Sequence, residues 1–253
     1  MGVNKDSNGF TFGFAIAMVV VVGVVLAITA MGLKPFQQEN VQQEKMQNIL
    51  AAINVNVSRN EAKTQFYDFI VERVALNYQG EVIEEKDGDI ITLDDGQEAF
   101  ESDPFNVDVK KEYRGLPAED RSYPMYICEK DDERFYVIPL VGKGLWGPIW
   151  GFVSLYGDGE TIYGANFDHK SETPGLGAEI SLPSFEEKFE ERSIFDKSGE
   201  FASVRVVKAG KAGDDPHKVD GITGGTITSV GVDEMLKRTL QIYIPYFENN
   251  KKS

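Results

Sequence analysis

The sequence of residues 123–167 is YPMYICEKDDERFYVIPLVGKGLWGPIWGFVSLYGDGETIYGANF. Aromatic and β-branched residues, which strands favour, fill four runs within it, at 123–128, 134–141, 147–156 and 161–167. Acidic or glycine-containing turns separate neighbouring runs. Short runs joined by such turns are typical of antiparallel strands that follow one another in a sheet. The segment therefore predicts an antiparallel meander at the centre of the fold.

A helical pattern precedes the meander. Ser58 and Glu61 have the spacing of a capping box, in which each residue satisfies a free amide of the other. Apolar residues then recur at near-helical spacing as far as Leu76. The pattern predicts a helix that begins after Ser58 and ends near Gly80, where glycine can adopt the left-handed cap conformation.

Five other segments complete the expected fold. Residues 81–95 predict a hairpin with an Asp-Gly turn, and residues 101–121, which lack periodicity, predict a loop. After the meander, residues 183–192 predict a helix with proline in its first turn, and residues 202–207 predict a strand. Residues 229–247 predict a closing helix. Strands in one run, with helices towards the ends, are typical of an α+β fold.

A long apolar run lies near the N-terminus. Residues 10–33 comprise 24 residues without a charge. As a helix they would span about 36 Å, against a hydrocarbon core of about 30 Å. One alternative is a signal peptide, but its apolar part normally has about 7–15 residues. The other is a buried core helix, but such helices usually have a polar face. We therefore expect a single transmembrane helix at 10–33, preceded by residues 1–9 and followed by a polar stalk at 34–57, with lysines on both sides that leave its orientation open.

Composition excludes several classes of site. The chain has 41 acidic and 26 basic residues, for a formal net charge of −15, so a nucleic acid is not an expected partner. Cys128 is the one cysteine, which excludes an intrachain disulfide and a thiolate metal cluster, and its strand position predicts a buried side chain. His169 and His217 are isolated, so we expect both to be exposed and predict no metal site.

Residues 220–229, DGITGGTITS, predict a phosphate site. Two glycines allow the backbone to approach a ligand closely, and the hydroxyls offer hydrogen bonds. The helix that follows directs its free amides and positive dipole end at this loop. The alternative is an ordinary helix cap, with Thr228 or Ser229 bonded to the amide of Gly231 or Val232. The loop lacks the spacing of a P-loop or of a dinucleotide-binding fingerprint, which argues against both.

Residues 220–228, DGITGGTIT, resemble the flavinylation motif of FMN-binding domains, D-x-x-[ST]-G-A-T-x-[ST]. In that family the last Thr or Ser carries FMN through its phosphate, placed by a flavin transferase, and Thr228 has this position. Gly225 departs from the pattern, because the family usually has alanine there. The resemblance implies further FMN contacts from the rest of the loop, namely Thr223, Gly224, Gly225, Thr226 and Ile227.

Two more segments, GKGLWGPIW at 142–150 and ETPGLGAE at 172–179, resemble motifs of the C subunits (NqrC) of sodium-translocating NADH:quinone reductases. That resemblance implies that Lys208 places a positive charge near the flavin or phosphate, where a solvated lysine is the alternative. The resemblance also implies residues that line the flavin, for which the alternatives are a core position for Leu145 and Trp146 and a plain turn for Gly177. The residues implied to line the flavin are Leu145, Trp146, Glu172, Thr173, Leu176 and Gly177.

The resemblance also implies a function. It suggests a redox subunit, not catalytic alone and without catalytic residues of its own. The subunit would relay single electrons through FMN in a reductase that exports sodium with subunits A, B, D, E and F. The implied location is the bacterial inner membrane, with residues 1–9 cytoplasmic and the FMN-binding α+β domain at 58–253 periplasmic. The alternatives are the G subunit of an Rnf-type electron-transport complex and a non-redox, membrane-anchored binding module.

Overall fold

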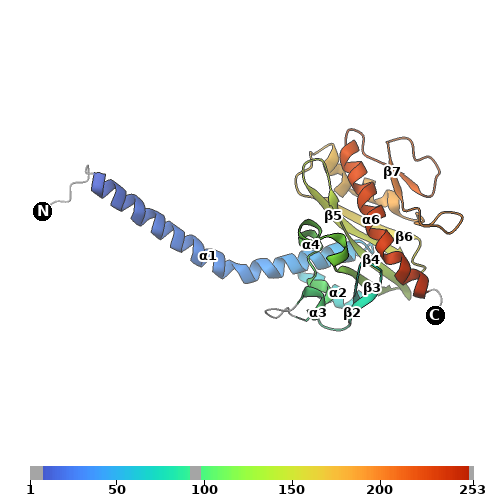
Figure 1. The fold of residues 1–253 in the computed structure, drawn as a ribbon, viewed down its shortest axis with the longest axis horizontal. Coiled ribbons are helices and arrows are strands. Elements are labelled where there is room, and N and C mark those ends of the chain that lie inside the picture. Colours follow the sequence, from blue (N-terminus) through green and yellow to red (C-terminus); the bar gives the residue numbers. More distant parts are fainter. Residues whose placement is uncertain (1–7, 92–97, 251–253) are drawn as a thin grey trace. The chain divides into compact units, whose positions relative to one another are not determined.

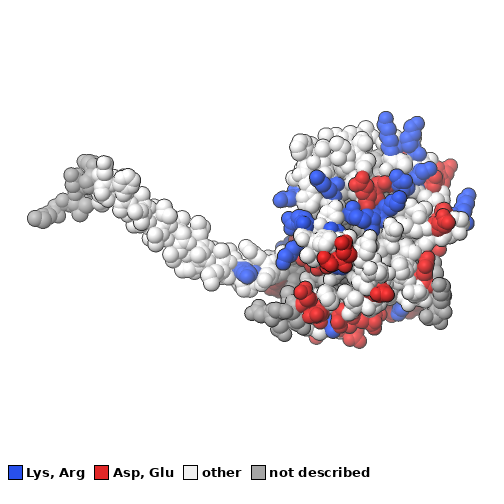
Figure 2. Space-filling view, in the orientation of Figure 1, with Lys and Arg blue, Asp and Glu red and all other residues white. Residues whose placement is uncertain are grey.

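The computed structural model describes residues 8–91 and 98–250. The chain divides into two units, Met1–Lys45 and Met46–Ser253. Helix α1 (Asn8–Ala51) runs through the first unit, and its residues 46–51 belong to the second. It is the one helix in the described residues that is long and apolar enough to cross a membrane. Figure 2 shows hardly any charged side chains along the N-terminal part of α1. Pro35 lies inside this helix, where it removes one backbone hydrogen bond.

A six-stranded antiparallel sheet forms the centre of the second unit (Figure 1). The spatial order of its strands is β2-β1-β3-β4-β5-β6, so the four strands of the predicted meander are neighbours in chain order. This confirms the α+β fold and the meander. The strands are β1 (Ile70–Leu76), β2 (Val82–Lys86), β3 (Tyr123–Lys130), β4 (Glu133–Lys143), β5 (Pro148–Tyr156) and β6 (Ile162–His169).

Helices and a small second sheet surround these strands. Strands β7 (Arg205–Val207) and β8 (Lys218–Asp220) pair in parallel. The longest helix of the second unit is α6 (Thr226–Asn250), which packs on β4. The shorter helices are α2 (Arg59–Phe69), α3 (Ala99–Ser102), η1 (Pro104–Asn106), α4 (Val109–Gly115), η2 (Ala118–Asp120), η3 (Gly177–Ser181), α5 (Pro183–Glu186) and η4 (Glu187–Phe189).

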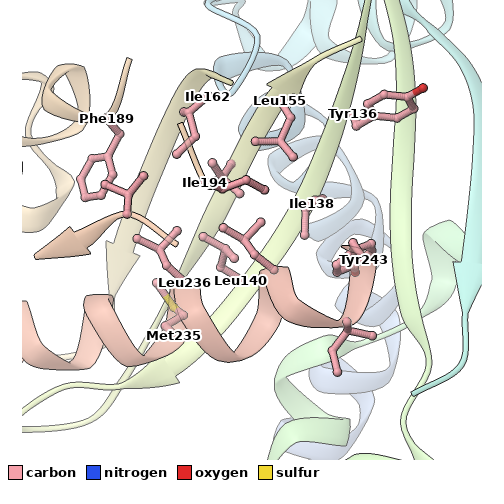
Figure 3. Close-up of a cluster of buried hydrophobic side chains, with 14 of the residues drawn as sticks. Tyr136, Ile138, Leu140, Leu155, Ile162, Phe189, Ile194, Met235, Leu236 and Tyr243 are labelled. Atoms are coloured by element: carbon pink, nitrogen blue, oxygen red, sulfur yellow. The ribbon is translucent and has the colours of Figure 1, made fainter. Parts of the chain in front are cut away.

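The sheet has an apolar core on each face. Successive strand residues point to opposite faces, so Tyr136, Ile138 and Leu140 of β4 join one cluster while Phe135 and Val137 join the other. Figure 3 shows the first cluster, in which side chains from α6 pack against the strands. The second cluster contains the end of α1 together with α2 and η1. Cys128 lies there, fully buried as expected, and burial raises the pKa of its thiol.

The helix predicted from Ser58 to Gly80 is wrong in its second half. The capping box is present, since the Ser58 amide donates to the Glu61 carboxylate, and α2 begins at Arg59. The helix ends at Phe69, however, and the β-branched run that follows forms β1. Pairing with β3, about fifty residues later, stabilises the strand, and a local pattern cannot show such a partner. Gly80, with φ +76°, lies in the turn between β1 and β2 and not in a helix cap.

Of the hairpin predicted within 81–95, the first strand is present as β2, which pairs with β1, and residues 89–91 form no strand. Part of that segment, residues 92–95, lies outside the described residues. The loop predicted at 101–121 contains short helical turns. The helix predicted at 183–192 is shorter, since α5 and η4 end at Phe189 and the Glu191 amide donates to the Ile162 carbonyl of β6.

Two predicted boundaries shift near the ends of the second unit. The strand predicted at 202–207 begins only at Arg205. Residues 34–57, predicted as a stalk, continue α1 to Ala51, and Met46, Ile49 and Leu50 are buried among α2 and η1. The closing helix begins at Thr226, three residues earlier than 229, which places Thr228 inside its first turn.

Candidate functional site

The motif at 220–229 connects β8 to α6, and its own polar groups fix it. The Asp220 carboxylate accepts hydrogen bonds from the amides of Ala212 and Lys211, which hold the pKa of Asp220 below its usual value. The Ser229 hydroxyl accepts a hydrogen bond from the Ile222 amide, at 2.9 Å. Gly224 has φ +79°, a conformation that glycine adopts without strain. The loop is therefore an ordered turn and not a flexible connection.

Thr228 is the third residue of α6 and is only 1% exposed. Its hydroxyl donates a 2.6 Å hydrogen bond to the Glu172 carboxylate. The Ser229 hydroxyl accepts its hydrogen bond from the Ile222 amide, earlier in the chain. The plain helix-cap alternative, with Thr228 or Ser229 bonded to Gly231 or Val232, is therefore wrong.

Glu172 connects three segments of the chain. It is 4% exposed, and its second carboxylate oxygen accepts a 2.8 Å hydrogen bond from the Trp146 amide. Its own amide donates to the His169 ring at the end of β6, at 3.2 Å. The turn after β4, the loop after β6 and the first turn of α6 thus meet at one carboxylate.

Two glycines allow these segments to come close to the Glu172 carboxylate. A Cβ atom on Gly144 would lie 2.5 Å from one oxygen of Glu172, and a Cβ atom on Gly177 would lie 2.5 Å from the other. The second of these would also press on the Thr228 hydroxyl. Both positions therefore require glycine in this arrangement, which goes beyond the plain turn role considered for Gly177.

An apolar rim surrounds the Thr228–Glu172 contact. Trp146 is 65% exposed, and Leu145, Leu176 and Ile227 are exposed as well. The alternative that Leu145 and Trp146 are core residues is therefore wrong. Leu176 lies against the motif, because a Cβ atom on Gly224 would lie 2.6 Å from its side chain. Exposed apolar side chains gathered in this way are typical of a binding surface.

The loop at 172–179 packs onto the motif and has its own hydrogen bonds. The amides of Leu176 and Ala178 donate to the Thr173 carbonyl, and the Gly175 amide donates to the Glu179 carboxylate. Thr173 and Gly175 are exposed, in contrast to Glu172 and Gly177. The loop is thus anchored at its two ends and exposed between them.

The remaining predicted residues lie at the margin. Thr223, Gly224 and Thr226 are exposed, and Gly225 is buried against Ile222 and Leu176. Lys208 is exposed on the turn whose Lys211 amide donates to Asp220. The structure therefore brings together Thr228, Glu172, Gly177, Leu176 and the Trp146 amide, while Lys208 stays on the surface.

Several residues of the site escaped sequence reasoning. His169 and His217 are half-buried, contrary to expectation. The His169 ring accepts a hydrogen bond from the Glu172 amide. Gly144 stands inside the GKGLW segment, and Ser229 follows the motif directly, so both had a signal in the sequence. His169 had none, because its partner is set by the path of the chain after β6.

The arrangement fits a phosphate-linked, planar cofactor such as FMN. The first backbone bond of α6 joins the Ser229 amide to the Gly225 carbonyl, so the amides of Thr226, Ile227 and Thr228 have no helical acceptor. These amides and the helix dipole favour an anion. The apolar rim suits a flat ring. Within the described residues, no group of three or more His, Cys, Asp or Glu side chains could hold a metal ion.

Comparisons with known proteins agree with this geometry. The FMN-binding domain family matches residues 144–241. The C subunit of the Na(+)-translocating NADH-quinone reductase of Yersinia pestis is 32% identical, over 90% of this chain and 87% of that protein. The corresponding protein of Neisseria meningitidis serogroup B is 29% identical, over 99% of this chain and 97% of that protein.

Solved structures show the same similarity. The crystal structure of the C subunit from Parabacteroides distasonis is 44% identical, has a TM-score of 0.72 and covers 85% of this chain and 96% of its own. Shewanella oneidensis NqrC, at 24% identity and a TM-score of 0.60, shares the fold over 82% of this chain and 98% of its own. Fold, motifs and relatives thus confirm the resemblance, and the chain belongs to the family of C subunits of Na(+)-translocating NADH-quinone reductases.

Proposed function

We propose that this protein carries FMN as a phosphoester on Thr228 and relays single electrons within a sodium-translocating NADH:quinone reductase. The observation that supports the attachment best is the position of the Thr228 hydroxyl. It lies in the first turn of α6, among amides without helical acceptors and beneath an exposed apolar rim. A hydroxyl that only stabilised the fold would not need exposed Trp146 and Leu176 beside it.

The roles of the residues follow from their surroundings. FMN, once bound, supplies reversible one-electron chemistry, and the protein supplies position and shielding. The amides at the start of α6 would hold the phosphate. Leu145, Trp146, Leu176 and Ile227 would cover the ring and exclude water, while Thr173 offers a hydroxyl to its polar edge. Thr223, Gly224, Gly225, Thr226 and Gly177 would shape the phosphate end, and Lys208 would contribute a positive charge at the margin.

The apolar part of α1 supports membrane anchoring. We propose a single-pass helix at 10–33 in a bacterial inner membrane, with residues 1–9 in the cytoplasm and the domain from 58 onward in the periplasm. The expected partners are subunits A, B, D, E and F of the reductase and a flavin transferase. Sodium export would depend on those partners, because the apolar run at 10–33 contains no charged residue to form an ion path.

Gel fluorescence tests the attachment. The full chain is produced together with a flavin transferase, separated by denaturing electrophoresis and viewed under ultraviolet light. We expect a fluorescent band near 28.2 kDa that is lost in Thr228→Ala and kept in the control Thr64→Ala, an exposed threonine of α2. If the wild-type band stays dark while a known acceptor is labelled in the same cells, the attachment is wrong and a non-redox binding module becomes the better description.

A further inference from the structure

The contact between Thr228 and Glu172 has a chemical consequence for the attachment itself. A threonine hydroxyl is a weak nucleophile unless a neighbouring base removes its proton. The Thr228 hydroxyl donates to a carboxylate oxygen at 2.6 Å, within the range required of a general base. Both side chains are almost fully buried, so little water competes for this proton.

We propose that Glu172 is the catalytic base within this chain for its own flavinylation, an inference that rests on the proposed function. In this step the Thr228 oxygen attacks the flavin-side phosphorus of a flavin adenine dinucleotide presented by the flavin transferase. A bond forms between that oxygen and phosphorus, and the phosphoanhydride bond breaks. The adenylate leaves with the bonding electron pair, and the Thr228 proton passes to Glu172. Nothing is oxidised or reduced.

Glu172 begins the loop at 172–179, but the groups that hold it lie outside that loop. Its second oxygen is fixed by the Trp146 amide, and its own amide is fixed by the His169 ring at the end of β6. Gly177 lies against the Thr228 hydroxyl, and the exposed residues 173–176 join Gly177 to Glu172, with Gly175 at φ +75° and open space around it. Moving Gly177 and the exposed segment before it away from α6 would expose the Thr228 hydroxyl, while the bonds to the Trp146 amide and the His169 ring keep the carboxylate in place.

The same proton transfer removes a charge conflict during the step. Once esterified, the Thr228 oxygen has no hydrogen to donate, and a carboxylate beside a phosphodiester would be repelled. The proton that Glu172 accepts in this step cancels its charge as the ester forms. Gly144 and Gly177 lie close against the two carboxylate oxygens of Glu172, so the carboxylate has little room to move away from Thr228.

Single-turnover kinetics test the proposal. The purified full chain, in detergent micelles, is mixed with flavin transferase and flavin adenine dinucleotide, and the fraction carrying covalent flavin is followed by intact-protein mass. Glu172→Gln keeps the size of the side chain but removes the base, so we expect the maximal rate to fall about 100-fold or more. The concentration of acceptor chain that gives half the maximal rate should change little. The matched control is Glu179→Gln on the same loop, where the carboxylate only holds the Gly175 amide, and it should react as the wild type does.

A second variant separates proton transfer from loss of structure. Glu172→Ala leaves a space where formate can act as the base, so formate should restore part of its rate and should not accelerate Glu172→Gln. If Glu172→Gln is labelled as fast as the wild type, or faster, the carboxylate only closes the site and the proposal is wrong. If the wild type itself is not labelled while a known acceptor is, the proposed function fails first and takes this inference with it.

Discussion

Two buried polar contacts in this protein differ in how completely they are satisfied. Arg73 and Asp103 form a paired contact with two hydrogen bonds, at 2.9 and 2.7 Å, and neither side chain is exposed. Arg73 also donates to the Gly88 carbonyl, and Asp103 accepts the amides of Phe105 and Ile91. Thr228 and Glu172 share a single hydrogen bond, with glycines against it and exposed apolar side chains around it.

The difference separates a structural contact from a functional one. Buried charges that pair with each other and also bond to nearby backbone groups hold the fold together, and they leave little for a ligand. The Thr228 hydroxyl has one partner and lies next to α6 amides that lack helical acceptors and to the exposed Trp146. Such a contact can be exchanged for a contact with a ligand. Measurements of the free energy of unfolding should therefore distinguish the two contacts, with the largest change at the ion pair and smaller changes around Thr228.

Asp103→Asn should have the largest effect. It removes the negative charge and leaves the Arg73 guanidinium buried without its partner, which costs about 3–5 kcal/mol of the free energy of unfolding. The measurement is chemical denaturation of the full chain in detergent micelles. The control Glu129→Gln breaks the pair with Arg134, whose side chains are both 52% exposed, and should cost at most about 1 kcal/mol. An Asp103→Asn variant as stable as that control would contradict the comparison.

Gly177→Ala should have an intermediate effect on stability and a large one on flavin attachment. The added methyl group would press on the Thr228 hydroxyl and on Glu172, so the loop must move away from α6. We expect a loss of about 1–3 kcal/mol, typical of overpacking, and little covalent flavin in the gel assay. Gly115→Ala is the control, because open space surrounds that position. Normal flavin attachment in Gly177→Ala would show that the close approach is dispensable.

The sequence predicted the fold where the signals are local. The meander, the start of α2 and the closing helix all follow from patterns within a few residues. Strand β1 was missed because its apolar residues also fit a helical period, and its partners in β3 lie about fifty residues later. Likewise, the end of α1 packs into the core against α2 and η1. Its mostly polar sequence did not predict these contacts.

The site was only partly predictable. Glu172 and Thr228 are 56 residues apart, and only the resemblance to a family placed both near one cofactor. No pattern in the residues could show that they bond to each other, because that contact depends on the path of the chain through β6 and η3. The same holds for His169. The exposure of Trp146 ran against the ordinary expectation for tryptophan, which is why it marks the site.

Glu186 is a half-buried carboxyl with one hydrogen-bond partner, the Phe167 amide. Burial raises its pKa to about 7, although the Phe167 amide donates to it at 2.7 Å and offsets part of the shift. In the unfolded chain the pKa of a glutamate is about 4.3. Between about pH 4.3 and pH 7 the folded protein therefore binds more protons at Glu186 than the unfolded chain does. The free energy of unfolding should therefore fall as pH rises from about 4.5 to 7, by about 1 kcal/mol once partial solvent exposure is allowed for.

Denaturation of the wild type and Glu186→Gln across this pH range measures that effect. Glu72 and Glu112 also have pKa values raised by burial, so the difference between the two proteins is the informative quantity. The difference should change with pH below 7 and level off above it. A constant difference from pH 4.5 to 8 would mean that Glu186 is charged in the folded state throughout.

The two tryptophans of the chain give the smallest and sharpest contrast. Trp150 is half-buried beneath the Lys110 ammonium, 3.5 Å from its ring centre, and Trp150→Ala should cost about 1–2 kcal/mol of stability while leaving flavin emission unchanged. Trp146 is 65% exposed, so Trp146→Ala should change stability by no more than about 0.5 kcal/mol. If its ring stacks on the flavin, as proposed, its removal should raise the flavin fluorescence of the labelled protein. A Trp146→Ala variant that is destabilised, with unchanged emission, would make Trp146 a structural residue and remove the contrast between the two regions.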